Sequence, residues 1–555
     1  VPGIGVPAPA PSHAIPLLRL RRHVADGHPA FLLGENRTHG WWYYFPVAFA
    51  LKTPLPTQFL LIASVARGVF SSLRRPLEKS GLLMRWGPVV LFPLLYGATT
   101  LASPLNIGYR HLLPVLPFLY ILAGRAARNT GYGVRIPYFV LRIPYSVFRI
   151  PLLLWLALGT LRIAPHYLAY FNELAGGPDN GWRYLADSNT DWGQGYKDLA
   201  RFQRERGLGI ILLSALVPTY DPAIYGVRYE PLTPMWGYTP AVFPSRFNPP
   251  PGDYVISATT LDGIPLVDPE MYDWFRKREP DARIAHVLFY YHVPSPDPAP
   301  EWVAQCAAPT APLPPEALAE GFGRDNLRQV EFDCTQAWLY PGGGSTAGWY
   351  VLERGSATDA PFARTHLAPA RLSYEQKRRG ALPPFRIYEW PAGTSVRDSA
   401  ALGLPEGVSS PMLLDGPLTF LGARALPGES RTGSASFILR SPGRDVLPEQ
   451  GSLTVETWWQ VTAGPITRPL SIMGHLLNGA GDLTGQNDGL GVSPVLWQPG
   501  DIIVQRHRFP SPPAGEELWL RTGVYWLDTM ERWPVAGIPR TDMLLIPLEN
   551  PSEED

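Results

Sequence analysis

The sequence predicts a multi-span α-helical membrane region followed by extracytoplasmic β-rich domains, one of which is a β-sandwich. Long apolar segments gather in the first third of the 555-residue chain. Short apolar runs separated by Gly and Pro turns fill the remainder, as in β-sheet domains. The composition favours the same fold class, since only 17% of residues are charged while 63 are proline. Such a mixture is unusual for a helical soluble enzyme.

The membrane prediction begins with the apolar segments at residues 41–70, 86–102, 112–124 and 150–163. They predict about four spans within residues 41–165, although most are short for the ~20 residues that a spanning helix needs. Flanking aromatic residues would have to supply the missing length. Buried helices of a soluble protein are also apolar, so length leaves that alternative open.

The distribution of basic residues favours the membrane alternative. The connection between residues 103 and 111 carries only Arg110 and His111 as basic groups. The connections on either side are rich in arginine and lysine: Arg74, Arg75, Lys79, Arg85, Arg125, Arg128, Arg135, Arg142 and Arg149. The positive-inside rule then places residues 1–40, the 103–111 connection and everything after about residue 165 outside the cytoplasm. We expect a multi-pass protein of the cell membrane with a large extracytoplasmic C-terminal region.

The domain boundaries follow from changes in pattern along the chain. We expect an external loop over residues 1–40, transmembrane helices over 41–165 and an external α/β region over 166–295. A helix is expected around residues 196–206 and a buried strand over 209–217. A small β element over 296–350 and a β-sandwich-like domain over 351–555 complete the chain, with strands near 452–461, 501–506 and 521–528.

The two cysteines of the chain, Cys306 and Cys334, both fall in the small β element. An extracytoplasmic position makes a single disulfide between them plausible, and it would restrict one loop of the unfolded chain. Two buried, unpaired thiols are the alternative.

Four segments resemble bacterial glycosyltransferases of family 39, the relatives of protein mannosyltransferases and of the lipid A aminoarabinose transferase. They read FLLGENRTHGWWYYFPVAFALKTPLP (31–56), IGYRHLLPVLP (107–117), YLAYFNELAGGP (167–178) and DSNTDWGQ (187–194). The resemblance covers roughly residues 25–230 and implies a GT-C membrane architecture. It implies inverting transfer of a monosaccharide from a polyprenyl-phosphate donor to a glycan or protein acceptor on the outer face of the membrane.

The chain departs from the family pattern in one respect. The catalytic carboxylate of the family lies in its first external loop, ahead of many helices, and nothing in this sequence corresponds to that loop. The catalytic residue is therefore unassigned. We expect the chain to be the C-terminal, inactive part of a longer protein, with an ordinary processed N-terminus as the alternative.

The donor phosphate needs cationic partners, and three residues are suitable. Lys52 lies at the expected membrane boundary, where a buried cation is costly without an anionic partner. Arg110 and His111 occupy the short external connection and offer donors to phosphate oxygens. Interaction of all three residues with lipid headgroups is the alternative.

Contacts to the sugar or the acceptor are predicted for a second group of residues. Asp187, Asn189, Asp191 and Trp192 combine carboxylates, an amide and an aromatic face within six positions. The same pattern is typical of a capped turn, which remains the alternative. Glu35 would orient an acceptor unless it is simply an exposed loop glutamate.

Other classes of function receive little support. The 48 basic and 48 acidic side chains give no reason to expect a nucleic-acid partner. No cofactor is predicted, the histidines lack zinc-ligand spacing, and a requirement for a divalent ion is left open. The competing class is a non-enzymatic, membrane-anchored envelope protein whose β-sandwich is a binding module.

Overall fold

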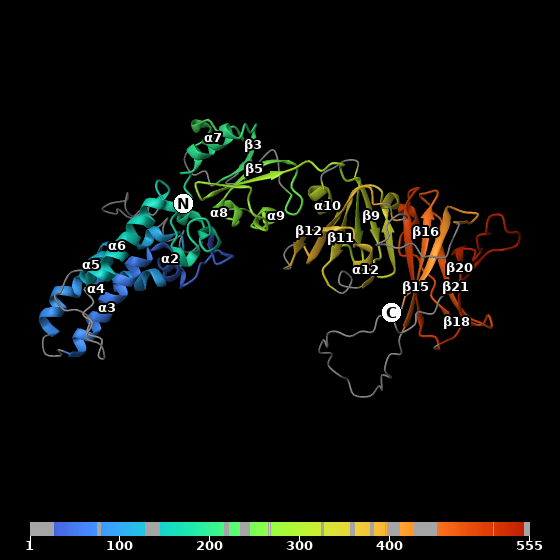
Figure 1. Cartoon of the computed structure of the whole chain (residues 1–555), viewed down its shortest axis with the longest axis horizontal. Coiled ribbons are helices and arrows are strands. Elements are labelled where there is room, and N and C mark those ends of the chain that lie inside the picture. Colours follow the sequence, from blue (N-terminus) through green and yellow to red (C-terminus); the bar gives the residue numbers. More distant parts are fainter. Residues whose placement is uncertain are drawn as a thin grey trace, which may run out of the picture. The chain divides into compact units, whose positions relative to one another are not determined.

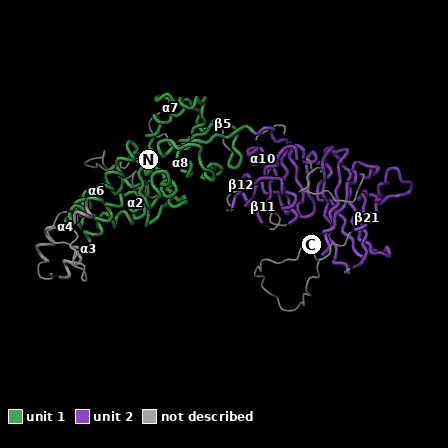
Figure 2. The backbone as a smooth tube through the Cα atoms, in the orientation of Figure 1, with its two compact units in different colours: residues 1–295 green, residues 296–555 purple. Residues whose placement is uncertain are grey.

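The computed structural model divides the chain into two compact units, residues 1–295 and 296–555 (Figure 2). The residues described are 27–74, 79–127, 145–215, 221–232, 245–264, 266, 268–322, 327–355, 361–377, 382–394, 396, 411–426, 452–513 and 515–548. Residues 1–26 of the expected external loop lie outside the described residues. So do four of the basic residues used in the membrane prediction: Arg75, Arg128, Arg135 and Arg142.

The first unit opens with a hairpin and a group of helices (Figure 1). The hairpin pairs β1 (Ala30–Leu32) with β2 (Glu35–Arg37). The helices are α2 (Tyr44–Lys52), α3 (Leu55–Arg74), α4 (Lys79–Leu101), α5 (Leu116–Ala127) and α6 (Tyr145–Arg162). The helix α3 packs against α5 and α6, and α4 packs against α5. Thr53 is extended because Pro54 follows it, and this ends α2.

The prediction of a multi-span helical membrane region is wrong. Among the described residues no single helix combines the length and the apolar composition that crossing a bilayer requires. Only α2 together with residues 55–66 of α3 meets that requirement, and the two are bent by 114°. The other apolar helical stretches, Gly87–Leu101, Leu116–Arg125 and Ile150–Arg162, have fewer than 18 residues. The flanking residues thus did not extend the short apolar segments, and the observed architecture is mixed helix and strand in five sheets.

Short 3-10 turns join the helices and lead to the second half of the unit. The turn η2 (Tyr109–Leu112) lies between α4 and α5, and the others follow α6: η3 (Tyr167–Ala169), η4 (Glu173–Ala175), η5 (Gly181–Arg183) and η6 (Asp187–Asn189). The turns η2 and η4 lie against α2, where Tyr44, Phe45, Leu112, Phe171 and Leu185 form one hydrophobic cluster. Segments that the sequence separates by more than one hundred residues therefore share one core.

A five-stranded α/β sheet forms the rest of the first unit, in the order β4-β3-β5-β7-β6. The strands are β3 (Ile211–Ser214), β4 (Tyr229–Pro231), β5 (Gly252–Ser257), β6 (Ala282–Ile284) and β7 (Leu288–Val293). The helices are α7 (Tyr196–Glu205), α8 (Ala258–Leu261) and α9 (Asp273–Arg276), with the turn η7 at Pro222–Tyr225. The strand β3 is parallel to both β4 and β5. Ser257 ends β5 and caps α8 by accepting the N–H of Thr260.

The second unit begins with a mixed sheet in the order β12-β13-β11-β8-β9. Its strands are β8 (Trp302–Cys306), β9 (Arg328–Phe332), β11 (Gly348–Glu353), β12 (Arg371–Gln376) and β13 (Phe385–Trp390), with helices α10 (Pro315–Phe322) and α12 (Pro361–His366). Cys306 and Cys334 are joined in a disulfide, with Cα atoms 5.3 Å apart.

Two antiparallel sheets complete the second unit and face each other as a sandwich (Figure 1). One has the order β10-β19-β16-β15-β14: β10 (Ala337–Tyr340), β14 (Met412–Leu413), β15 (Leu418–Leu426), β16 (Ser452–Val461) and β19 (Ile502–Pro510). The other has the order β18-β17-β20-β21: β17 (Leu470–Asn478), β18 (Leu483–Gln486), β20 (Leu518–Trp526) and β21 (Leu544–Leu548). The turns η8 (Pro341–Gly344) and η9 (Pro494–Leu496) lie between strands.

The sandwich and the mixed sheet interleave along the chain. The strand β10 precedes residue 350 yet pairs with β19 of the sandwich, whereas β11, β12 and β13 belong to the mixed sheet. Trp338, Trp458 and Trp497 are buried in a core that both parts share. Large aromatic side chains bury about 150–250 Å² each, so they contribute strongly to the stability of such a core.

Candidate functional site

The predicted site residues come from three segments of the first unit. Lys52 ends α2, Arg110 and His111 lie in η2, and the group from Asp187 to Trp192 begins with η6. The structure brings these three segments into contact, and Glu35 stands apart from them. We call the contacting set, consisting of Lys52, Arg110, His111, Asp187, Asn189, Asp191 and Trp192, the loop cluster.

Asn189 is the centre of the loop cluster and is fully buried. Its Oδ1 accepts the backbone N–H of Tyr109 at 2.8 Å. Its Nδ2 donates to the Tyr44 hydroxyl at 2.8 Å and to the carbonyl of Ala186 at 2.9 Å. One side chain therefore connects α2, η2 and η6 and uses all of its amide groups in doing so.

Lys52 supports the same connection from inside the protein. Its Nζ donates to the carbonyl of Leu168 at 2.7 Å and also to the carbonyl of Asn189. The ammonium lies 4.4 Å from the centre of the Phe171 ring. These acceptors replace part of the water that a buried ammonium loses, and burial still lowers the pKa of Lys52 to about 7. Lys52 thus holds the end of α2 to two loops.

Arg110 and Trp192 form the exposed part of the loop cluster. Arg110 is exposed, and its guanidinium lies over the indole ring of Trp192, with Cζ 5.4 Å from the ring centre. Trp192 is 42% exposed, which leaves much of the ring open to solvent. A guanidinium over an indole face is a cation–π arrangement that keeps its N–H donors available at the edge.

His111 follows Arg110 in the chain and packs against Phe45. The centres of the His111 and Phe45 rings are 6.1 Å apart. Its Nε2 is buried and forms no hydrogen bond with any described residue. Burial, together with the neighbouring Arg110 charge, lowers the pKa of His111 below its usual value. His111 is therefore neutral near pH 7 and offers one unused polar atom rather than a positive charge.

Two aspartates of the loop cluster each have one carboxylate oxygen without a hydrogen-bond partner in the part of the chain that the structure describes. Asp187 has φ of 56°, a left-handed conformation that is uncommon for aspartate, and its Oδ2 is buried and unbonded. Burial raises the pKa of Asp187, while Arg110 and His28 act in the opposite direction. Such a combination of backbone strain and an unsatisfied oxygen is more common at functional sites than elsewhere.

Asp191 is the more buried of the two. Its Oδ1 accepts the N–H of Gly193 at 2.8 Å, and its Oδ2 has no partner. Burial raises the pKa of Asp191 to about 7. The hydroxyl of the preceding residue, Thr190, lies 3.5 Å from the hydroxyl of Thr259 in α8. The loop cluster therefore continues into the end of the parallel strands, where α/β folds often bind ligands.

Glu35 lies on the exposed hairpin strand β2. Its carboxylate pairs with Arg37 at 3.0 Å, and both side chains are more than half exposed. The hairpin is tied to the α/β part through Asn36, which donates to the carbonyl of Asp262 at 2.8 Å. The structure therefore does not bring Glu35 into the loop cluster.

Several residues of the site were not predicted from the sequence. Tyr44 and Tyr109 each bond to Asn189. Asn172 fixes the turn after α2 by donating to the carbonyls of Ala50 at 2.6 Å and Thr53 at 2.8 Å. All three residues lie in segments that carry the family resemblance. The motifs therefore contained a signal that reasoning about charged residues alone overlooked.

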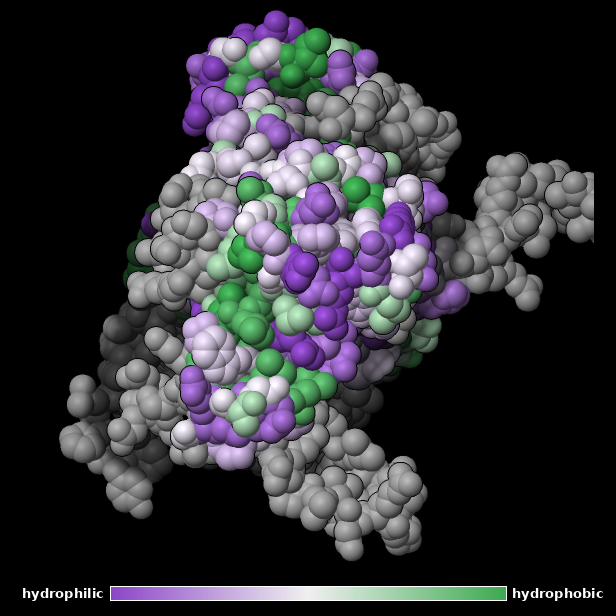
Figure 3. Space-filling view, turned by 90° about the vertical axis from the view of Figure 1, so that its right-hand side faces the viewer, coloured by the Kyte–Doolittle hydropathy of each residue, from purple (hydrophilic) through white to green (hydrophobic). Residues whose placement is uncertain are grey.

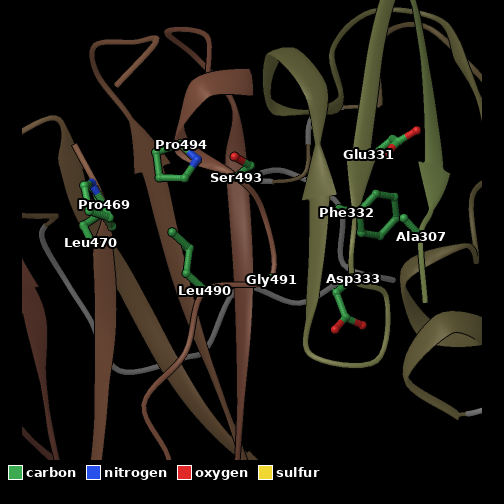
Figure 4. Close-up of a pocket in the computed structure, with 10 residues that line it drawn as sticks. All are labelled: Ala307, Glu331, Phe332, Asp333, Pro469, Leu470, Leu490, Gly491, Ser493 and Pro494. Atoms are coloured by element: carbon green, nitrogen blue, oxygen red, sulfur yellow. The ribbon is translucent and has the colours of Figure 1, made fainter. Parts of the chain in front are cut away.

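The second unit contains a separate open cleft of about 420 Å³ beside the disulfide (Figure 4). Phe332, Leu470 and Leu490 give it apolar walls, and Glu331 and Asp333 stand on one side. The Asp333 carboxylate accepts from Thr335 at 2.9 Å and from Gln336 at 2.7 Å. Because local donors satisfy this carboxylate, the cleft offers less unused bonding capacity than the loop cluster does.

The described residues contain no group of three or more His, Cys, Asp or Glu side chains arranged to hold a metal ion. Comparison with protein-family models, with curated proteins and with solved structures finds no match for this chain. The loop cluster must therefore be interpreted from its own geometry.

Proposed function

We propose that the loop cluster binds the phosphate and sugar of a polyprenyl-phosphate monosaccharide, as part of a glycosyltransferase that passes the sugar to a glycan or protein acceptor. The pairing of Arg110 with Trp192 carries the proposal. It places an exposed cation beside an exposed aromatic face, which are the two groups that a phosphosugar requires.

Arg110 would bind the phosphate. Its guanidinium presents several N–H donors in a plane and suits bidentate binding of phosphate oxygens. Lys52 is already bonded to two carbonyls, and His111 is half-buried and neutral. The positive charge available to a ligand of the loop cluster therefore comes from Arg110.

Trp192 would stack on the sugar ring. The aliphatic face of a pyranose packs well on an indole, and the hydroxyls at its edge need polar partners. Asp187 would supply one, since its Oδ2 has no partner among the described residues. The four segments that build this cluster are those that resemble family 39, and this resemblance is the reason for proposing a lipid-linked sugar as the ligand.

The lipid part of the donor needs an apolar surface, and the helices offer one. Exposed apolar side chains occur on α3, α4, α5 and α6: Phe59, Ile62, Val65, Leu91, Leu94, Leu95, Ile121, Leu153, Leu154, Leu158 and Leu161. Exposed apolar side chains gathered on neighbouring helices often mark contact with lipid or protein. We propose that these side chains contact the prenyl chain and the membrane surface that holds it.

The test measures the binding of a short-chain prenyl-phosphate hexose to the full chain. Tryptophan fluorescence or calorimetry detects the binding. Arg110→Ala should weaken binding about tenfold or more, because a charge-assisted phosphate contact is lost. Trp192→Ala should abolish the preference for the prenyl-phosphate hexose over the same prenyl phosphate without sugar.

The matched control is Arg278→Ala. Arg278 lies 3.6 Å from the centre of the Trp274 ring in a second cation–π pair outside the loop cluster. This variant should bind the donor like the wild type. Equal binding by the wild type and Arg110→Ala would overturn the proposal, as would equal loss in Arg278→Ala.

A further inference from the structure

The outer face of the sheet β18-β17-β20-β21 carries a polar and aromatic group on the side away from the sandwich core. Leu476 and Leu520 are opposite each other and point into the core. Because side chains alternate along strands, the neighbouring pair His475 and Arg521 points outward. In Figure 3 this end of the molecule shows hydrophobic patches among hydrophilic residues.

His475 is the buried centre of this outer group. Its Nδ1 accepts from Arg521, with Nη2 at 2.7 Å and Nε at 3.2 Å. Since Nδ1 is an acceptor, Nε2 carries the proton, and it lies 3.3 Å from the Asp488 carboxylate. Burial lowers the pKa of His475, with the Arg521 charge acting in the same direction and Asp488 opposing it. A neutral His475 is consistent with accepting from a guanidinium.

Asp488 is satisfied by its neighbours. Its carboxylate accepts the N–H of Gly474 at 2.9 Å, the Gln486 amide at 3.0 Å and the Tyr525 hydroxyl at 3.2 Å. With these bonds and the His475 contact, little of its bonding capacity remains for a ligand. The acidic member of the group is therefore a structural anchor.

Arg521 differs, because within the described residues it forms no ion pair with a carboxylate, and His475 is neutral. Its side chain is partly exposed, and the guanidinium keeps the N–H donors that His475 does not take. A partly exposed arginine held in place by a histidine is pre-organised for an anionic oxygen.

Trp519 lies two residues before Arg521 on the same face of β20 and is partly exposed. Its Nε1 donates to the Glu517 carboxylate at 3.2 Å, which fixes the orientation of the indole. Leu483 and Leu545, both about half exposed, belong to the two outer strands of the sheet. The result is a fixed aromatic face beside a fixed cation.

We propose that this outer face binds an acidic polysaccharide, with a sugar ring stacked on Trp519 and its carboxylate bound by Arg521. The positive charge without a carboxylate partner selects an anionic sugar, and the aromatic face selects a ring rather than a free anion. The proposal concerns a different unit from the loop cluster and does not depend on the proposed function.

The test is isothermal titration of the full chain with an oligosaccharide of uronic acids, in parallel with a neutral cello-oligosaccharide. The uronate should bind, and the neutral oligosaccharide should bind at least about tenfold more weakly. Arg521→Ala should remove most of this preference, and Trp519→Ala should weaken both ligands about threefold to tenfold. Binding of the uronate should weaken as salt is added.

Arg371→Ala is the matched control, because Arg371 is an exposed strand arginine that is paired with Glu389 in the mixed sheet. It should bind the uronate as the wild type does. Arg521→Lys and Trp519→Phe, which preserve charge or ring, show whether a loss reflects misfolding. Absence of uronate binding by the folded wild type would overturn the proposal, and so would equal affinity for both oligosaccharides.

Discussion

Two fully buried aspartates, one in each unit, differ in how completely their carboxylates are hydrogen-bonded. Asp501 of the second unit accepts two bonds from Arg328, each at 2.6 Å, and the N–H groups of Gly342 at 3.0 Å and Gln498 at 2.9 Å. Asp191 of the first unit accepts the N–H of Gly193, and its other oxygen has no partner among the described residues. Both side chains are inaccessible to solvent.

The difference shows where each unit uses its polar groups. A buried charge is tolerated when it is paired and hydrogen-bonded, and Asp501 then connects β9, η8 and the start of β19. An unsatisfied buried carboxylate costs free energy and is unusual outside functional sites. The comparison therefore assigns Asp501 to structure and makes the neighbourhood of Asp191 the candidate site.

The largest effect is expected from breaking the Asp501 pair. Arg328→Ala leaves a buried carboxylate without its counter-ion, so the second unit should lose about 3–5 kcal/mol of unfolding free energy. Native-state hydrogen exchange of the β8, β9 and β11 amides measures this loss in the affected unit. Protection unchanged from the wild type would contradict the structural role of Asp501.

Asp191 should give the first unit a dependence of stability on pH. Its folded pKa of about 7 lies above the ordinary value of 3.8. The folded state therefore retains a proton that the unfolded state has released, and stability falls as pH rises from about 4 to 7. The loss is at most about 4 kcal/mol. Asp191→Asn should flatten this dependence in hydrogen exchange of the β3 and β5 amides. A variant that retains the full slope would show that another group is responsible.

A matched pair of asparagines separates support of the fold from binding. Asn189 and Asn172 are both buried, and each bonds to several partners. Replacing either with alanine should cost about 1–3 kcal/mol, because buried partners lose their bonds. Only Asn189→Ala should also weaken donor binding, since Asn189 positions the η2 turn that carries Arg110. Equal binding loss in Asn172→Ala would show that binding merely follows stability.

The smallest effect is expected at Glu35. Its ion pair with Arg37 is exposed on both sides, and such pairs contribute about 0–1 kcal/mol. Glu35→Ala should change unfolding free energy by less than about 0.5 kcal/mol and leave donor binding unchanged. A large loss of donor binding would show that Glu35 belongs to the binding site, contrary to its position in the structure.

Several local elements were accessible from the sequence. The helix expected around residues 196–206 is α7, and the run at 209–217 contains β3. The expected strands near 452–461, 501–506 and 521–528 correspond in position to β16, β19 and β20. These elements are signalled by alternating apolar residues and by the turn residues between the strands. Both are local properties, so they can be recognised in the sequence alone.

The helical region was misjudged because hydropathy does not reveal where a helix stops or bends. The apolar run through Lys52 is divided at Thr53 and Pro54, where α2 and α3 meet at a 114° bend. The charge pattern predicted sides of a membrane for segments that the structure gives as separate helices, none of which, among the described residues, is both long and apolar enough to cross a bilayer. Neither feature is fixed by the average apolarity of a segment.

The sequence by itself determined the residue types of the site: an arginine, a tryptophan and two aspartates in motifs that lie far apart along the chain. Tertiary structure decided their roles. It buried Lys52 against two carbonyls, exposed Arg110 over Trp192, and left Asp191 with an unbonded oxygen. These outcomes depend on which segments pack together. The solvation and partners of a charged group follow from that packing, and no local pattern in the sequence encodes them.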